Sequence, residues 1–256
     1  MSTNREPIKA HIKREVRQRC GFGCILCGKP LYEYDHILGY AITERHVADE
    51  LTLLCDQHHA EKTKELLPQD AVLKANADPH NVRVGVSTPY GVHYSGDTCV
   101  LRLPTCLYEG QKPELVPLLV RDQEIIAFRF VDDNVFLNCT IVRPDGEIGL
   151  LIEENELIYK TDSWDVEFVG RTLTIRNGSR DLLVKVEFRP PSEVFIERLN
   201  LVYSDMRLWV DDRGLHVRGP RLGNIERERD LAGVRAAGRV CISLDSKPVP
   251  GVGVDL

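Results

Sequence analysis

The chain has 256 residues, of which 43% are hydrophobic and 28% are charged, and its formal net charge is -6 at pH 7. An acidic balance argues against indiscriminate binding to polyanions, and this length can bury one large core and a second small one. Residues 1–10 are polar and charged, and no later apolar run is long enough to cross a bilayer, so the sequence predicts a cytoplasmic protein. Because the cytosol is reducing, the eight cysteines are expected to be metal ligands or buried thiols.

The first predicted element is a helix over residues 8–19. Ile8, Ile12 and Val16 recur at four-residue spacing and form an apolar stripe. Against one acid, the segment carries five cations that could contact phosphates: Lys9, Lys13, Arg14, Arg17 and Arg19. We predict that this basic surface contributes to nucleic-acid binding, and an ordinary solvated charged face is an alternative of nearly equal weight.

Two pairs of metal-ligand residues follow the helix. Cys24 and Cys27 form a Cys-x2-Cys pair, and Cys55 and His58 repeat the same internal spacing. Three thiolates and one imidazole are the set that a closed, tetrahedral structural zinc site requires. Gly28 suits a tight knuckle after the first pair. Cys20 and Cys24 could form the first pair instead, but their wider spacing favours Cys20 as a buried thiol.

Between the two pairs, residues 31–37 predict a strand, and residues 56–67 predict a helix that Pro68 ends. Alternation places Asp35 and His36 on opposite sides of a regular strand, so a bulge or bend is needed if both approach one centre. On the helix, His58 and His59 point about 100° apart and would serve two different ions. Lys62 shares a face with His59, where its ammonium could contact a phosphate.

This order of motifs resembles the HNH (His-Asn-His) endonuclease family, over residues 8–68. The resemblance implies a β-hairpin and a helix around one catalytic metal, with Asp35 and His59 as ligands of Mg²⁺ or Mn²⁺ and His36 as the general base. The position of the family's middle asparagine is occupied by Glu50. Glutamate can accept a hydrogen bond but cannot donate amide protons, so Glu50 is expected to pair with His36 or to add a carboxylate near the metal.

The predicted function is therefore a metal-dependent endonuclease acting on nucleic acid, with DNA preferred as the substrate. Imidazole can activate water near neutral pH, and a divalent metal can stabilise charge on the leaving oxygen. The alternative is a catalytically inactive zinc module that binds nucleic acid or a protein. A homodimer would bring two such centres together, and a modular nuclease suits host defence by analogy.

The rest of the chain has a different character. Residues 71–90 contain several helix-breaking residues and predict a connector. Beyond it, branched segments alternate with turn signals such as Asn177-Gly178 and Asp211-Asp212-Arg213-Gly214. The strands are predicted at residues 118–120, 124–130, 135–142, 157–159, 166–169, 173–175, 182–188 and 194–202.

The whole chain is thus predicted to be α+β. A zinc-stapled ββα domain (1–70) precedes an all-β domain (91–256) that is mainly antiparallel, as a sandwich or barrel, with a short solenoid as a further option. This second domain would select a target, sense a ligand or associate with a partner. Its notable residues are expected to pack in the core: Trp164, Trp209, Tyr203, His216, Cys99, Cys106, Cys139 and Cys241. The arginine-containing tail after Gly219 carries no motif.

Overall fold

The computed structural model describes residues 6–219, 229–231, 233, 235–237, 239–244 and 252–255. The chain is of mixed α+β type, with many strands and few helices, and it divides into two compact units. Unit 1 contains residues 1–88 and 160–168, and unit 2 contains residues 89–159 and 169–256. The predicted boundary near residue 70 is therefore too early, and unit 1 also includes a distant segment of the chain.

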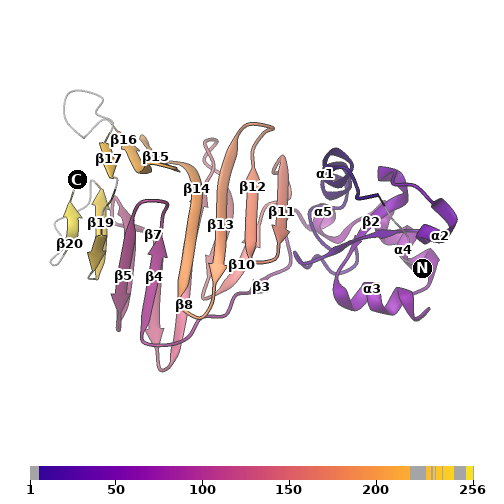
Figure 1. Ribbon diagram of the computed structural model, residues 1–256, viewed down its shortest axis with the longest axis horizontal. Helices are drawn as coiled ribbons and strands as arrows, with labels where there is room; N and C mark the ends of the chain where they lie inside the picture. The colour runs from indigo at the N-terminus through magenta and orange to yellow at the C-terminus, as the bar shows by residue number, and fades with distance from the viewer. Residues whose placement is uncertain are drawn as a thin grey trace. The chain divides into compact units, whose positions relative to one another are not determined.

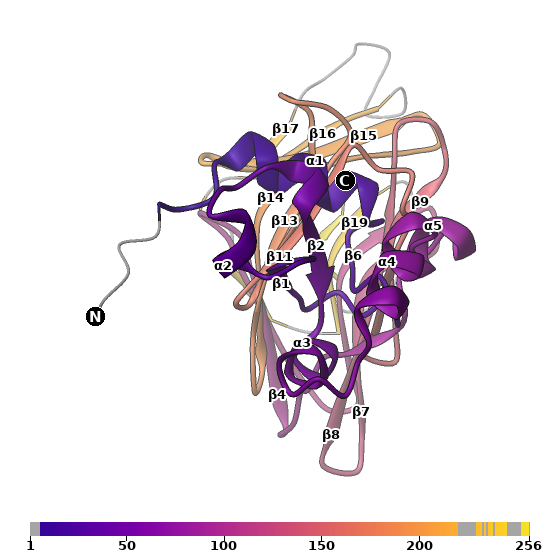
Figure 2. The same cartoon turned by 90° about the vertical axis from the view of Figure 1, so that its right-hand side faces the viewer.

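Unit 1 is built from short elements around a small core (Figure 2). Its elements are α1 (Ala10–Arg19), β1 (Glu33–His36), α2 (Tyr40–Thr43), the short 3₁₀ helix η1 (Ala48–Glu50), β2 (Leu51–Leu54), α3 (Asp56–Thr63), α4 (Gln69–Ala77) and α5 (His80–Val84). β1 and β2 pair antiparallel, and α3 follows β2 directly and packs against both strands. Val16, Leu51, Leu53 and Val72 form the buried centre of this unit.

Two details of unit 1 differ from the sequence prediction. The helix expected to reach residue 67 ends at Thr63, because Glu65 adopts a left-handed backbone conformation with φ of 61°. Residues 71–90, expected to be a connector, instead contribute most of α4 and all of α5. Asn81 of α5 is fully buried and donates from Nδ2 to the carbonyl oxygens of Gly21 and Gly28, at 3.0 and 3.1 Å. The segment is thus part of the folded unit.

Unit 2 is a sandwich of two sheets, seen as two layers of strands in Figure 1. The first sheet has the order β20-β19-β6-β7-β8-β9-β10-β3. Its strands are β3 (Tyr90–Gly91), β6 (Glu114–Val120), β7 (Gln123–Val131), β8 (Asn134–Val142), β9 (Ile148–Glu153), β10 (Glu156–Tyr159), β19 (Val240–Leu244) and β20 (Val252–Asp255).

The second sheet of unit 2 runs β12-β13-β14-β15-β16-β17, and β4, β5 and β18 extend it from β14. Its strands are β4 (Thr98–Arg102), β5 (Leu107–Gln111), β12 (Thr172–Arg176), β13 (Leu182–Arg189), β14 (Glu193–Tyr203), β15 (Met206–Asp211), β16 (Gly214–Arg218), β17 (Arg229–Leu231) and β18 (Arg235–Ala237). β11 (Asp165–Val169) precedes them and contributes Asp165 to Phe168 to unit 1.

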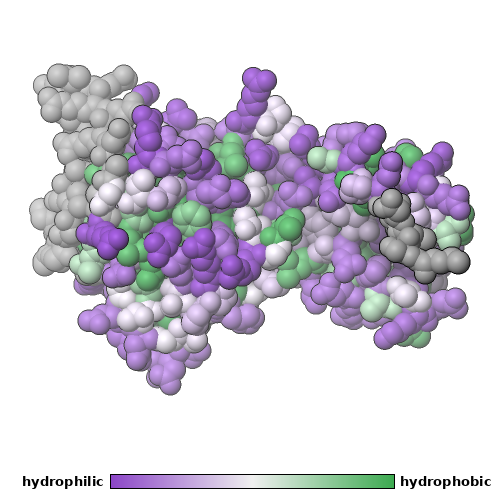
Figure 3. Space-filling view, in the orientation of Figure 1, coloured by the Kyte–Doolittle hydropathy of each residue, from purple (hydrophilic) through white to green (hydrophobic). Residues whose placement is uncertain are grey.

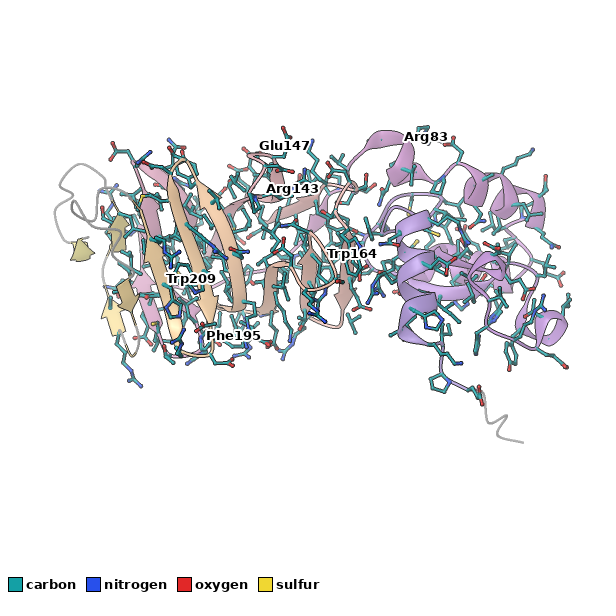
Figure 4. The ribbon with its side chains drawn as sticks, turned by 90° about the horizontal axis from the view of Figure 1, so that it is seen from above. Arg83, Arg143, Glu147, Trp164, Phe195 and Trp209 are labelled. Carbon is teal, nitrogen blue, oxygen red and sulfur yellow. The ribbon has the colours of Figure 1, made fainter. Side chains whose placement is uncertain are left out.

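Most strand pairs are antiparallel, as predicted, and the exceptions are the parallel pairs β4–β14, β5–β18, β6–β19 and β19–β20. The two sheets enclose one apolar layer, in which Ile126, Leu137 and Ile152 of the first sheet meet Val184 and Ile196 of the second. Figure 4 labels Trp209 and Phe195 on one outer side of unit 2, and Arg143 and Glu147 on the opposite side.

The residues expected to pack in the core differ in how far they are buried. His216 and the four cysteines of unit 2 are buried, whereas Trp164, Trp209 and Tyr203 are only partly buried. The face of unit 2 seen in Figure 3 is mostly hydrophilic, with scattered apolar residues. No helix in the described part of the chain has the length and apolar character needed to span a membrane.

Candidate metal centre and catalytic site

Four side chains predicted to bind zinc come together in unit 1. The ligand atoms of Cys24, Cys27, Cys55 and His58 all lie within 4.8 Å of one another. His58 Nδ1 is 3.3 Å from both Cys24 Sγ and Cys55 Sγ, and Cys27 Sγ is 3.7 Å from Cys55 Sγ. Metal–ligand bonds of about 2.0–2.3 Å around a tetrahedral zinc place neighbouring ligand atoms roughly 3.5–3.8 Å apart. The cluster therefore has the composition and size of a closed zinc site.

The local fold explains this convergence. Cys24 and Cys27 lie in the turn after α1. A hydrogen bond of 3.0 Å from Ile25 N to Leu53 O joins this turn to β2. Cys55 ends β2 and is the N-cap of α3, so that His58 follows in the first helical turn. Gly28 has φ of 73°, and a Cβ atom there would lie 2.2 Å from Asn81 Oδ1. The knuckle thus requires glycine, as predicted.

The two cysteines of the knuckle shift each other's pKa. The Cys27 thiol lowers the pKa of Cys24 to about 4, and Cys24 raises the pKa of Cys27. A lowered pKa favours the thiolate, which is the form that binds metal. Cys20 lies outside the cluster, with its Sγ 3.9 Å from Thr52 Oγ1, and burial raises its pKa. The preference for Cys24 and Cys27 over Cys20 is confirmed.

A second group of side chains lies where β1 meets α3. His59 Nε2 is 3.5 Å from Asp35 Oδ1, and its other nitrogen, Nδ1, is 3.2 Å from Glu33 Oε2. Two ligands of one Mg²⁺, each at about 2.1 Å, must lie within roughly 4.2 Å of each other, so Asp35 and His59 can share an ion. Glu33 and Asp35 thus place one carboxylate near each ring nitrogen of His59.

Lys62 neutralises the carboxylate of Asp35 in this group. Its ammonium donates to Asp35 Oδ2 and to the carbonyl oxygen of His36. The side chains of Lys62 and Asp35 are 16% and 13% exposed, so this ion pair is largely removed from water. Lys62 therefore competes with a metal for the carboxylate. Among the described residues, the Cys/His cluster is the only group of three or more His, Cys, Asp or Glu side chains close enough to hold an ion.

His36 belongs to a separate, aromatic group. β1 and β2 pair in regular register, with Asp35 opposite Thr52 and His36 opposite Leu51, so the pairing contains no bulge of the kind that, like a bend, was expected to bring both side chains to one centre. His36 is 8% exposed, and its ring lies edge-on to Tyr40 with the centroids 5.0 Å apart. Its Nε2 lies 3.2 Å from the carbonyl oxygen of Arg45 and 3.2 Å from His46 Nδ1. Lys62 connects the two groups by bonding the carboxylate of Asp35 and the backbone of His36.

Glu50 contacts neither the imidazole of His36 nor Asp35 through any described hydrogen bond. It instead accepts hydrogen bonds from Nε and Nη2 of Arg45, which lower its pKa, and the charge of His36 contributes a smaller effect in the same direction. The carbonyl oxygen of Arg45 contacts His36 Nε2, so Arg45 lies between Glu50 and His36.

The predicted phosphate-binding surface on α1 is mostly used within the fold, which corrects the prediction. Arg17 is 3% exposed, and its guanidinium donates to both oxygens of Asp165 at 2.8 and 2.6 Å. Arg19 donates to the carbonyl oxygens of Ala48 and Leu51.

The remaining cations of α1 are less constrained. Arg14 lies 4.5 Å from the ring of Trp164, which is labelled in Figure 4, and Lys13 lies 5.5 Å from the ring of Tyr34. Lys9 stays exposed. Of the five predicted cations, Lys9 and Lys13 are therefore the best placed to meet an external phosphate.

Comparison with known proteins gives no match: no family model, no curated protein and no solved structure is significantly similar to this chain. The sequence reasoning also missed three residues that shape the site, Glu33, Arg45 and His46. Glu33 could have been found, because strand alternation places it on the same side as Asp35. Arg45 and His46 lie in the loop between α2 and η1, where no periodic pattern predicts the direction of a side chain.

Proposed function

We propose that unit 1 is a metal-dependent endonuclease of the HNH type that hydrolyses phosphodiester bonds, with DNA as the preferred substrate. The observation that carries the proposal is the approach of His59 Nε2 to Asp35 Oδ1, at 3.5 Å, one residue away from the Cys/His cluster. A zinc ion on Cys24, Cys27, Cys55 and His58 would fix the start of α3, and hence the direction of His59.

The roles of the residues follow from their chemistry. Asp35 and His59 would hold one Mg²⁺ or Mn²⁺, which supplies charge stabilisation at the leaving oxygen. His36 accepts a proton from the attacking water as general base. The ion pair between Lys62 and Asp35 breaks when the metal binds, and the ammonium of Lys62 is then available to a substrate phosphate. Glu50 supports His36 indirectly, through Arg45.

The test is cleavage of supercoiled DNA, linear single strands and RNA by the purified chain with Mg²⁺ or Mn²⁺. We expect His36→Ala to lower the rate at least about 100-fold, with zinc content and folding preserved. His93→Ala, at an exposed position in unit 2, is the matched control and should cleave normally. Full cleavage by the His36→Ala protein would contradict the proposal.

Glu50 allows a second test of the same proposal. If its role is to hold Arg45, then Glu50→Asn should lower cleavage, because the asparagine cannot replace the charge pair. Higher cleavage by Glu50→Asn would mean instead that the glutamate is a handicap.

The ion pair between Lys62 and Asp35 favours one alternative, a zinc module that binds nucleic acid or protein without hydrolysis. In such a module Lys62 would permanently neutralise Asp35, and no divalent metal would enter. The two functions differ in Mn²⁺ binding: the nuclease binds Mn²⁺ in addition to zinc and loses this binding in His59→Ala, whereas the inactive module binds zinc only.

A further inference from the structure

His46 forms the end of a short chain of hydrogen bonds that leads to His36. His46 Nε2 lies 2.8 Å from the carbonyl oxygen of Glu6, and His46 Nδ1 lies 3.2 Å from His36 Nε2. The two imidazole centroids are 5.1 Å apart, and Tyr40 packs on both rings. His46 is partly buried and belongs to the same unit as His36.

The acceptors at each end determine which nitrogens carry protons. A carbonyl oxygen can only accept, so His46 Nε2 must carry the hydrogen that it donates to Glu6. In a neutral imidazole the other nitrogen, Nδ1, then bears the lone pair and accepts. His36 Nε2 faces this lone pair and also the carbonyl oxygen of Arg45, at 3.2 Å. These two contacts assign the hydrogen to His36 Nε2.

We propose that His46 is a positioning residue for the general base: it holds His36 as the Nε2–H tautomer, so that Nδ1 is the nitrogen that removes a proton from water. This inference rests on the nuclease function proposed above and adds a residue to it. No feature of the Cys/His cluster or of the Asp35 and His59 pair requires His46.

The arrangement matters most when charge develops on His36. As the water oxygen forms its bond to phosphorus, its proton moves to His36 Nδ1, and the bond to the leaving oxygen breaks; that oxygen takes up a proton from solvent. The imidazolium so formed donates its Nε2–H to Arg45 O and His46 Nδ1 more strongly than neutral imidazole does. His46 therefore stabilises the transition state more than the substrate complex, and its loss should appear in kcat.

Two substitutions distinguish the role of His46 Nδ1 as a hydrogen-bond acceptor from the packing of the His46 ring. His46→Phe keeps a ring against Tyr40 and removes the acceptor. His46→Asn can place Oδ1 near the position of Nδ1 and accept the same hydrogen bond. We expect kcat to fall roughly 10- to 100-fold in His46→Phe, with KM little changed, and to recover most of its value in His46→Asn. His93→Phe is the control for adding a phenyl ring elsewhere and should leave both constants unchanged.

The tautomer of His36 gives a readout that does not depend on turnover. In protein labelled with ¹⁵N at histidine, at about pH 8 where ordinary histidines are neutral, two-bond ¹H–¹⁵N correlations distinguish the tautomers. We expect the Nε2–H pattern for His36 in the wild type and in His46→Asn, and a smaller Nε2–H population in His46→Phe. His36→Ala identifies the signals.

The outcomes are distinct. An Nδ1–H pattern for wild-type His36 would overturn the inference, as would equal kcat in the wild type and His46→Phe. Equal losses in His46→Phe and His46→Asn would do the same, because they would indicate a packing role. If the wild type cleaves none of the substrates, the nuclease proposal fails and the catalytic role of His46 fails with it. The tautomer pattern would then still decide whether the hydrogen-bond chain exists.

Discussion

At the scale of single residues, Lys62 is the group that a metal would have to displace from Asp35 in the proposed catalytic site. Its ammonium already neutralises Asp35 and contacts the backbone of His36. A divalent cation that binds Asp35 must displace this ammonium, so the free energy of metal binding is reduced by the free energy of the ion pair. Because both side chains are largely shielded from water, that reduction is larger than for an exposed pair.

Replacing Lys62 should therefore strengthen metal binding. In Lys62→Met the competing ammonium is lost while the length of the side chain is kept, and we expect Mn²⁺ to bind at least several-fold more tightly. Titration calorimetry of the zinc-loaded protein measures this affinity, and His59→Ala in the same titration should bind Mn²⁺ more weakly than the wild type. Unchanged Mn²⁺ affinity in Lys62→Met would mean that Asp35 is not a ligand.

The candidate metal cluster could be predicted from sequence, because the spacing of Cys24, Cys27, Cys55 and His58 is itself a constraint on distance. The approach of His59 to Asp35 was predicted from the family resemblance, and the geometry is compatible with it. The contacts of His36 were not predictable. They come from Arg45 and His46 in an irregular loop, whose path depends on tertiary packing.

At the scale of elements, α1 is held to the segment 160–168 by a buried charge pair. Burial alone would lower the pKa of Arg17, but its bonds to Asp165 outweigh this effect and raise it. The two side chains are 4% and 6% exposed. Arg17 Nη1 also donates to Glu167 at 2.7 Å, so the cost of leaving a buried charge without any partner, about 3–5 kcal/mol, is an upper bound for the loss of Asp165.

We expect Asp165→Ala to lower the free energy of unfolding of unit 1 by about 2–4 kcal/mol, because Glu167 still pairs with Arg17. Urea denaturation followed by the fluorescence of Trp164 in a Trp209→Phe background measures this change. Asp70→Ala is the matched control, because it breaks an exposed pair with Lys74 whose atoms are 4.0 Å apart and should cost less than about 1 kcal/mol. A similar small loss in both variants would show that Asp165 does not anchor α1.

In unit 2, β4, β13 and β14 are linked by charges. Glu193 accepts hydrogen bonds from Arg102, at 2.9 and 3.1 Å, and from Arg189, at 2.7 Å. The bonds from Arg102, followed by those from Arg189, lower the pKa of Glu193 below its ordinary value of 4.5. The unfolded chain therefore binds a proton more readily at this position than the folded chain does.

This shift predicts a loss of stability in acid. The contribution of Glu193 is fully present above its ordinary pKa and disappears as the pH falls through the lower pKa of the folded state. We expect the urea midpoint of unit 2, followed by Trp209 in a Trp164→Phe background, to fall less between about pH 6 and pH 3 in Glu193→Gln than in the protein with Glu193. Parallel curves for the two proteins would exclude a role for this carboxylate.

The strands of unit 2 show which elements a sequence can specify. β7, β8, β13 and β14 alternate buried and exposed residues or carry long branched runs, and all four were predicted. β4, β5 and β16 were not. β5 contains Glu109, Gly110 and Gln111, which do not favour a strand locally, and it forms because β4 and β18 pair with it.

At the scale of the whole molecule, the two compact units should respond differently to removal of the metal. The proposed zinc ligands all belong to unit 1, and structural zinc contributes about 10–16 kcal/mol to folding in small zinc peptides. Unit 2 has a large apolar core of its own.

We expect a strong chelator, or the substitution Cys55→Ser, to lower the unfolding temperature reported by Trp164 by more than about 10 °C and to leave that reported by Trp209 nearly unchanged. The chain has these two tryptophans only, one in each unit, so the single-tryptophan variants named above separate the signals. Equal shifts at both tryptophans would show that the units unfold together, and no shift at Trp164 would contradict a structural zinc.

The segment 160–168 of unit 1 is synthesised long after the rest of that unit. Its first 88 residues leave the ribosome well before Asp165, and the 71 residues between Thr88 and Lys160 take roughly 4 to 14 s to translate at about 5–20 residues per second. During that time the first part of unit 1 carries Arg17 without Asp165 and Glu167. A polypeptide released early, by truncation or by proteolysis, would lack these two carboxylates, so its unit 1 should be less stable than the same unit in the full chain.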